Sequence, residues 1–144
     1  MKLFFDTNIF LDLLLNRPDF ADDAAEILAG CASGAFIGGF STLSACDIAY
    51  FLRKELGWDV AEAELAKVCG YVELIDTTAA SVRNNLQRPH VDFEDSVQLS
   101  CAEQWGADVI ITRDKRGFTG SPLKVMTPAE FLNDAPEIAQ EGGK

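Results

Sequence analysis

The chain has 144 residues, a length typical of one domain with a single hydrophobic core. Hydrophobic residues make up 48% of it, and a mean hydropathy of +0.05 indicates a globular protein rather than a disordered one. The formal net charge of −11 excludes a broadly basic surface for binding nucleic acid, and no run approaches the roughly 18 apolar residues of a membrane span.

Apolar spacing and turn residues divide the first half of the chain into alternating strands and helices. Residues 2–5 form an apolar run that stops at Asp6, which predicts a buried strand. Residues 7–16 carry apolar side chains at helical spacing, and Pro18 marks the end of that helix. The remaining predicted elements here are helices over 22–32, 41–56 and 59–69 and a glycine-containing strand over 35–40.

The same alternation continues in the second half. A strand over 71–75 and a helix over 78–87 precede a break at Arg88-Pro89-His90. The next helix is expected to open at Asp92 or Phe93 and to end at Gly106. The last predicted elements are a buried, parallel-type strand over 108–112, a short strand over 123–126 and a closing helix that starts at Thr127-Pro128.

This order of elements predicts an α/β fold with a mostly parallel sheet and helices on both of its faces. No repeat or linker divides the sequence, so residues 1–134 are predicted to form one domain. Residues 135–144, which end in EGGK, are expected to be a loose C-terminal tail.

The apolar N-terminus raises the question of a secretory signal peptide. Three polar residues interrupt the apolar run, and no small-residue cleavage pattern follows it: Asp6, Asn8 and Asp12. We therefore expect a mature N-terminus and a cytoplasmic protein.

Cysteine and histidine usage argues against zinc, disulfide and histidine chemistry. Four cysteines are scattered singly in predicted helices among apolar residues, where a free thiol behaves as a small apolar side chain: Cys31, Cys46, Cys69 and Cys101. The single histidine, His90, makes histidine-centred hydrolysis a poor expectation.

Four aspartates are predicted to meet at one edge of the sheet. Asp6 ends the first strand, and Asp114 lies just beyond the strand over 108–112. Asp47 and Asp95 lie near the starts of helices. Because the carboxyl ends of parallel strands and the starts of the helices that follow them share one edge, we expect these carboxylates to converge.

Three of the four aspartates also have a simpler interpretation. Asp6 fits a helix cap, Asp95 a solvated acid favoured by the helix dipole, and Asp114 a turn residue. Asp47 lies among apolar residues, where a carboxylate needs a partner. The hypothesis therefore rests on convergence, because crowded carboxylates repel one another unless a cation lies between them. Mg²⁺ and Mn²⁺ accept such oxygen ligands and can activate water for phosphodiester hydrolysis.

Four segments together resemble PIN-domain proteins, nearest to the bacterial group related to VapC-type toxins. They cover nearly the whole chain in order: FFDTNIFLDLLLNR, STLSACDIAYFLRK, VDFEDSVQLSCAEQWGADVIITRDKRGF and MTPAEFL. The resemblance implies a three-layer α/β/α fold with a central, mostly parallel sheet of about five strands. It also implies a Mg²⁺- or Mn²⁺-dependent endoribonuclease, frequent homodimers and, in toxin members, inhibition by a small antitoxin protein.

The motifs of that family assign roles to individual residues. The D-T-N motif implies Asp6 as a metal ligand, and the family's mid-chain acid falls at Asp47. The F-E-D and T-R-D motifs imply Asp95 and Asp114 as further ligands. The expected catalytic set is therefore these four aspartates, of which all but Asp47 bind metal. Two polar side chains are expected to support them: Asn8 and Thr112.

The chain departs from the family in one visible place. Many relatives continue the T-R motif into an Asp-Phe pair, whereas this chain has Gly117-Phe118, which predicts weaker metal binding. Three basic residues beside Asp114 are expected either to contact RNA phosphates or to form an ordinary exposed loop: Arg113, Lys115 and Arg116.

Three functional hypotheses follow. The leading one is an RNA endonuclease, in the toxin case one half of a toxin–antitoxin pair. The second is a PIN-like module that binds RNA or a protein partner without cutting, which the charge of −11 and Gly117 motivate. The third is an aspartyl-phosphate phosphatase with Asp6 as nucleophile, but Asn8 stands where that chemistry usually has a second acid.

Overall fold

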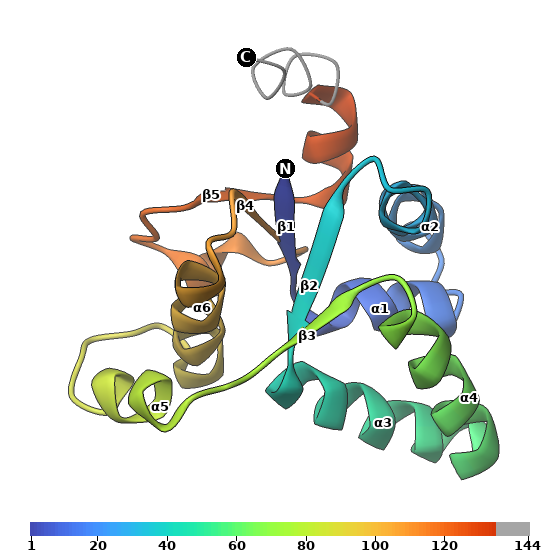
Figure 1. The fold of residues 1–144 in the computed structure, drawn as a ribbon, viewed down its shortest axis with the longest axis horizontal. Helices are drawn as coiled ribbons and strands as arrows, with labels where there is room; N and C mark the ends of the chain where they lie inside the picture. Colours follow the sequence, from blue (N-terminus) through green and yellow to red (C-terminus); the bar gives the residue numbers. More distant parts are fainter. Residues whose placement is uncertain (135–144) are drawn as a thin grey trace.

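Five parallel strands form one sheet, in the spatial order β3-β2-β1-β4-β5 (Figure 1). The computed structural model describes residues 1–134, so the expected tail over 135–144 lies outside the described residues. The strands are β1 (Lys2–Phe5), β2 (Ile37–Ser41), β3 (Glu73–Ile75), β4 (Val109–Ile111) and β5 (Lys124–Met126).

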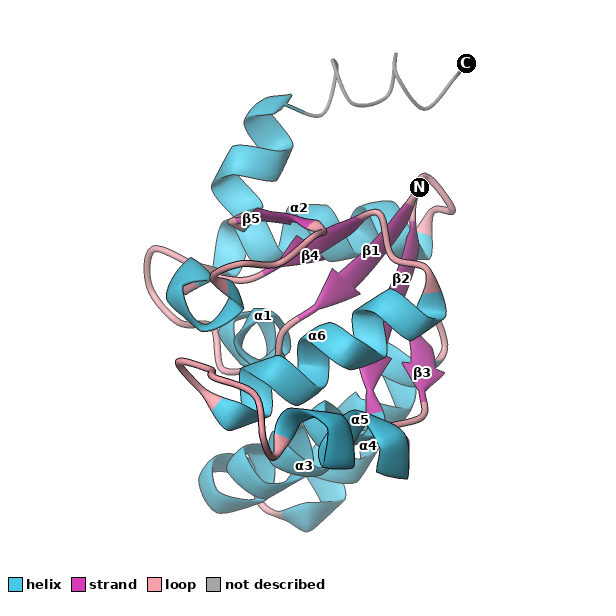
Figure 2. Ribbon diagram, turned by 90° about the vertical axis from the view of Figure 1, so that its left-hand side faces the viewer, coloured by secondary structure: helices cyan, strands magenta, loops and turns pink. Residues whose placement is uncertain are grey.

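Helices cover both faces of this sheet, which confirms the predicted three-layer α/β/α arrangement. In Figure 2, α6 crosses in front of the strands, and α1 and α2 lie behind them. The helices are α1 (Thr7–Leu14), α2 (Ala21–Ala32), α3 (Thr42–Leu56), α4 (Trp58–Cys69), α5 (Ala79–Asn85) and α6 (Phe93–Trp105), with a 3-10 helix η1 (Lys115–Phe118). Residues 128–134 are helical, and none of the helices within 1–134 is long and apolar enough to cross a membrane.

Alternating side chains of the central strands fill two hydrophobic cores. In β1, Leu3 and Phe5 belong to the larger core with α1, α2, α3 and α4, whereas Phe4 belongs to the smaller core with α6. The strand β2 passes α2 closely, because a Cβ on Gly38 would lie 2.8 Å from the Cys31 sulfur. Successive side chains of a strand point to opposite faces, so an apolar run without polar interruption fits a sheet covered on both sides.

Most predicted boundaries are confirmed to within a few residues. Asp92 caps α6 through its side chain, and Gly106 ends that helix in the left-handed conformation, at φ +83°. The strand predicted over 71–75 begins only at Glu73, because the backbone amides of Tyr71 and Val72 bond back to Val68 and complete the last turn of α4.

The four cysteines lie in helices, as predicted, but only two of them are buried. Cys31 and Cys101 pack in the two cores, whereas Cys46 and Cys69 are exposed on α3 and α4. The expectation of apolar surroundings is therefore confirmed for Cys31 and Cys101 and wrong for Cys46 and Cys69. The pattern of one sequence does not determine which side of a helix faces the core.

Candidate functional site

The candidate site lies where the strand order reverses. The chain passes from β1 to β2 on one side, and β4 pairs with β1 on the other side. At such a point the loops beyond the two strands separate and leave a crevice that commonly binds ligands. Asp6 directly follows β1, and its backbone amide donates to Ile111 of β4 over 3.0 Å. Thr112 and Asp114 follow β4 at the same edge.

Asp6 is held in a fixed position by two hydrogen bonds. Its Oδ1 accepts from the backbone N of Thr7 at 2.8 Å, and its Oδ2 accepts from the Thr112 hydroxyl at 2.9 Å. The same hydroxyl accepts from the backbone N of Asp114 at 3.2 Å, so Thr112 ties both loops together. Burial raises the pKa of Asp6, with a further rise from the charges of Asp92 and Asp114. Asp6 is therefore both the cap of α1 and a partly buried carboxylate whose charged form burial disfavours.

A buried polar network fixes the starts of α1, α3 and α6 relative to one another. Ser44 lies 2.8 Å from the Thr7 hydroxyl and accepts from Gln98 Nε2 at 2.7 Å. The Ser41 hydroxyl donates to Gln98 Oε1 at 2.7 Å and caps α3 through the amide of Ser44. All four side chains are buried, so the network leaves little freedom to the nearby carboxylates.

Asp95 lies in the first turn of α6, close to Asp6 and Asp114. Burial raises its pKa to about 7, and the charges of Asp6, Asp92 and Asp114 contribute to the rise. A Cβ built on Gly117 would fall on the Asp95 Oδ2, so the carboxylate occupies the space beside that glycine. A side chain at position 117 would therefore have to displace Asp95.

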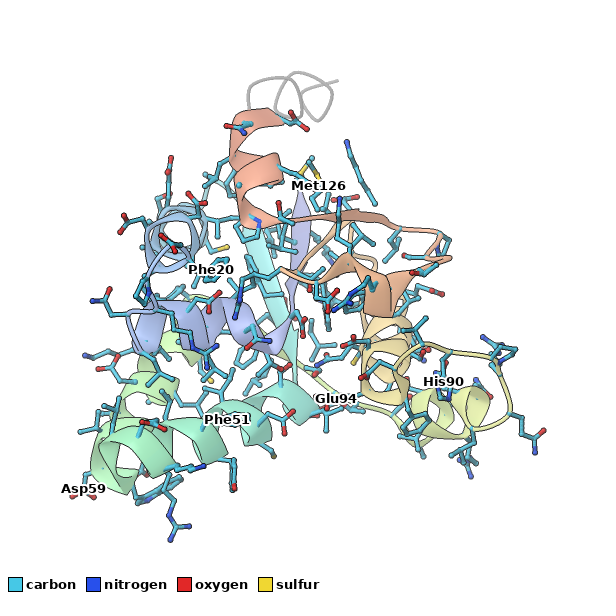
Figure 3. The ribbon with its side chains drawn as sticks, turned by 180° about the vertical axis from the view of Figure 1, so that it is seen from behind. Phe20, Phe51, Asp59, His90, Glu94 and Met126 are labelled. Atoms are coloured by element: carbon cyan, nitrogen blue, oxygen red, sulfur yellow. The ribbon has the colours of Figure 1, made fainter. Side chains whose placement is uncertain are left out.

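Asp47 meets Glu94, a residue to which the sequence assigned no role. A hydrogen bond between the two carboxyl groups, burial, and the charges of Asp47, Asp6 and Asp92 raise the pKa of Glu94 to about 8. Figure 3 shows Glu94 where the start of α6 approaches the start of α3. The F-E-D motif contained this residue, but its contact with Asp47 depends on how α3 and α6 pack.

Asp114 differs from the other acids because it already has a cationic partner. Arg116 donates to it through Nε at 2.9 Å and through Nη2 at 2.8 Å, and the backbone N of Arg116 donates at 3.1 Å. These hydrogen bonds lower the pKa of Asp114 to about 2. The Asp114 side chain is 57% exposed, so it lies at the outer margin of the acidic cluster.

The donor chemistry of this cluster fits a hard divalent cation. Its carboxylate and hydroxyl oxygens are the ligands that Mg²⁺ and Mn²⁺ prefer. Burial is the main cause of the raised pKa values of Asp6 and Asp95, and the hydrogen bond to Asp47 is the main cause for Glu94, while repulsion between carboxylates adds to all three. Within residues 1–134, however, no three histidine, cysteine, aspartate or glutamate side chains lie close enough to hold an ion together. A shared ion would require these side chains to move towards one another.

The basic residues of the neighbouring loop all have carboxylate partners. Arg113 Nε lies 2.7 Å from Asp12 Oδ2, and its guanidinium stacks on Phe20 at 4.1 Å from the ring centre. Lys115 pairs with Glu130 at 2.8 Å, and Arg116 pairs with Asp114. Little free positive charge is left for a phosphate, so the predicted substrate contacts of this loop stay a prediction.

Asp12 is a second buried acid whose role the sequence did not reveal. Only 1% of its side chain is exposed, and Arg17 Nη1 lies 3.4 Å from its Oδ1. Arg17 also donates to Asn8 Oδ1 at 3.0 Å, so the predicted supporting residue Asn8 contacts this ion-pair cluster. The pattern that could have revealed Asp12 is a carboxylate within the apolar stripe of α1.

Several solved structures with a similar fold are described as bacterial VapBC, VapC or toxin–antitoxin proteins. The VapBC2 complex of Rickettsia felis, bound to a promoter DNA fragment, matches with a TM-score of 0.65 and 20% identity, over 88% of this chain and 98% of that one. A toxin–antitoxin complex from Klebsiella pneumoniae matches with a TM-score of 0.63 and 21% identity, over 88% and 97%. The VapC20 toxin of Mycobacterium tuberculosis, described as cleaving the sarcin–ricin loop, matches with 0.62 and 16%, over 78% and 90%.

At these identities the likeness establishes the fold alone. No curated protein matches the sequence. The sequence profile of the PIN domain matches residues 2–116, which is most of the chain. The five-stranded parallel sheet, the acids at its switch point and this match agree, and the chain belongs to the PIN domain family.

Proposed function

We propose that this chain is a Mg²⁺- or Mn²⁺-dependent endoribonuclease. The observation that carries the proposal is a group of acids at the switch point of a PIN domain whose charges no ion pair compensates within residues 1–134: Asp6, Asp47, Glu94 and Asp95. Mutual repulsion between these carboxylates lowers the stability of the folded protein. Such a cost is typical of a functional site, here one that binds a cation and, through it, a phosphodiester.

Asp6, Asp95 and Asp114 would hold the ion, and Thr112 fixes Asp6 for that purpose. When bound, the divalent cation supplies an activated water and offsets the charge that develops on the phosphate oxygens. Asp47, with Glu94 as its hydrogen-bond partner, would orient the attacking water. Asn8 would assist by holding Arg17 beside α1.

The test is cleavage of a labelled single-stranded RNA by metal-free protein to which Mn²⁺, Mg²⁺ or EDTA is added. We expect cleavage only with metal, and a loss of at least about 100-fold in Asp6→Asn and in Asp95→Asn. Glu26→Gln on the exposed side of α2 removes one charge far from the site and should leave the rate unchanged. Undiminished cleavage in both site variants would disprove the mechanism.

Within this proposal the chain acts as a toxin with a small antitoxin protein as partner. Two of the similar solved structures are described as complexes of this kind, which supports an antitoxin at the level of the family. Exposed apolar side chains on α3 and α4 offer a surface for a protein partner or for a second copy in a homodimer: Tyr50, Phe51, Leu56, Trp58 and Val60. The RNA substrate also fits the cytoplasmic location expected from the sequence.

A second candidate function is a module that binds RNA or protein without cutting. Two observations favour it: the net charge of −11, and the wide spacing of the acids within residues 1–134. Calorimetric titration with Mn²⁺ separates the two candidates. A nuclease should bind the ion stoichiometrically and lose that binding in Asp95→Asn, whereas a binding module should show no specific uptake.

A further inference from the structure

A polar pocket beside Asp95 has no part in the site described so far. It has a volume of about 380 Å³, which lies in the range of roughly 300–1,000 Å³ typical of small-ligand sites. The α5–α6 loop, one side of α6 and the loop after η1 enclose it. Its polar lining includes Asn85, Arg88, His90, Ser96, Glu103 and Thr119.

The pocket adjoins the acidic cluster directly. Gly117 lines it, and a Cβ on that glycine would fall on Asp95 Oδ2. Ser96, the residue after Asp95, lines it as well. Asp95 itself does not line the pocket, but Gly117 contacts both the pocket and the carboxylate that we propose as a metal ligand.

The charge of this pocket differs from that of the adjacent loop and of the other pocket near α1. Arg88 forms no ion pair with any residue that the structure describes, in contrast to Arg113 of the loop after β4. Glu103 is the one carboxylate among the described lining residues. By comparison, the charged residues that line the pocket between α1 and α2 are three aspartates and one arginine: Asp12, Asp19, Asp23 and Arg113. On a chain of net charge −11, the pocket at Arg88 is thus the more suitable place for an anion.

The pocket lining also includes an aromatic ring, the imidazole of His90. The His90 ring packs against Phe93, with 5.5 Å between ring centres and 54° between ring planes, which restrains its orientation. Figure 3 shows His90 outside α6, on the segment that follows α5. Histidine rings stack on bases of single-stranded RNA. The Ser96 and Thr119 hydroxyls donate to backbone carbonyls over 3.0 Å and 2.7 Å, which leaves their oxygens to accept from a base amino group or the ribose 2′-OH.

We infer that this pocket is the subsite for one nucleotide of single-stranded RNA, adjacent to the phosphodiester to be cut. Arg88 contacts the phosphate of that nucleotide, and His90 stacks on its base. This inference rests on the proposed function and adds a location for the substrate. It also explains how a strongly acidic chain can bind RNA without free cations in the loop after β4.

The first test measures the phosphate contact of Arg88. A fluorescein-labelled single-stranded RNA is titrated with Asp6→Asn protein, which should not cut it, by fluorescence anisotropy at several salt concentrations. Arg88→Gln should weaken binding about fivefold and reduce the slope of log K against log salt by about 0.7, the value for one phosphate on a single strand. Arg83→Gln on α5 removes the same charge outside the pocket and should change neither quantity.

The second test measures stacking on His90. His90→Ala should weaken binding of the same RNA about tenfold, whereas His90→Phe, which keeps a flat ring, should bind within about twofold of the parent. Equal losses in both variants would contradict stacking. A DNA probe of the same sequence that binds as tightly as the RNA would overturn the choice of RNA.

The outcomes separate the pocket from the proposed reaction. If the wild-type protein cuts RNA but Arg88→Gln and His90→Ala bind like the parent, the subsite is wrong and the nuclease stands. If the wild-type protein binds RNA through these residues but never cuts it with metal, the nuclease is wrong and the subsite stands. If Arg83→Gln weakens binding as much as Arg88→Gln does, the effect is general electrostatics and the subsite is wrong.

Discussion

Two groups of acids lie near the end of β1 and have opposite surroundings. Asp12 in α1 lies between the guanidinium groups of Arg17 and Arg113, within 3.4 Å and 2.7 Å. Asp6 and Asp95 lie in the candidate site and form no ion pair with any residue in 1–134. Burial raises the pKa of all three carboxyl groups, so the two surroundings differ in the cations they contain.

The difference indicates a functional origin for the unpaired group. The fold places arginines against a buried carboxylate at Asp12, six residues after Asp6 on α1, so partners are available in this architecture. The candidate site instead keeps acids that repel one another, around a buried hydrogen-bond network that holds their helices in place. Such a cluster is stable only with a positively charged ligand or with protonation.

The largest effect is expected from removing the paired acid. Asp12→Ala leaves two guanidinium groups without their carboxylate, and breaking a buried pair costs about 3–5 kcal/mol when both partners are fully buried. Because the Arg17 and Arg113 side chains are 32% and 27% exposed and can regain water, we expect a loss of about 2 kcal/mol in urea unfolding. Glu26→Gln serves as control, and an equal loss there would remove the contrast between the two groups.

The next effect concerns the space beside Asp95. Gly117→Ala would place a methyl group on the Asp95 Oδ2 and turn that carboxylate away, so the affinity for Mn²⁺ should fall about tenfold. The side chain can rotate, so the folded state should lose little stability. In an Asp95→Ala background the carboxylate is gone and only the Cβ of residue 95 stays near the added methyl, at 3.0 Å, so the residual metal binding should not change. A full tenfold loss there would show that Gly117 acts in another way.

A smaller effect is expected on the pH dependence of the metal-free protein. The pKa of Asp95 is about 7 in the folded protein and ordinary when unfolded, so the folded state binds the extra proton between about pH 4 and 7. The proton bound to Asp95 stabilises the folded state; this stabilisation is fully present below about pH 4 and is lost as the pH rises through about 7. Asp95→Asn removes this titration, so it should unfold a few degrees above the wild type at pH 8 and together with it at pH 4. The opposite order at pH 8 would contradict unpaired repulsion in the cluster, and saturating Mn²⁺ should narrow the gap by stabilising the wild type.

The sequence predicted the order of strands and helices because apolar periodicity and caps are local properties. It also predicted that Asp6 and Asp114 share an edge, since both follow strands of a parallel sheet. It did not predict the Asp12–Arg113 pair, because those residues are distant in sequence and meet only when α1 packs beside the loop after β4. The Asp47–Glu94 contact was missed for the same reason.

Gly117 illustrates a different limit of sequence reasoning. Compared with relatives, it is a missing acid, which predicts weaker metal binding. In the structure its lack of a side chain leaves room for the Asp95 carboxylate and forms the wall of the nucleotide pocket. The volume that a side chain would need depends on neighbouring helices, and a motif does not contain that information.

The smallest expected effect is on the affinity for Mn²⁺. It tests whether Asp114 is a metal ligand like Asp6 and Asp95 or an ion-paired acid like Asp12. Arg116→Gln removes the two guanidinium hydrogen bonds to Asp114, which are the largest cause of its lowered pKa, and leaves the backbone hydrogen bond in place. The carboxylate is then freer to turn towards Asp6 and Asp95. If Asp114 is a ligand, Mn²⁺ should bind about twofold more tightly, with no shift in the unfolding midpoint, because the pair is exposed. Lys115→Gln removes the same charge from the same 3-10 helix but frees Glu130 instead, so it reports the general electrostatic effect. Equal affinities in the two variants would assign Asp114 to the paired acids and leave Asp6 and Asp95 as the ligands.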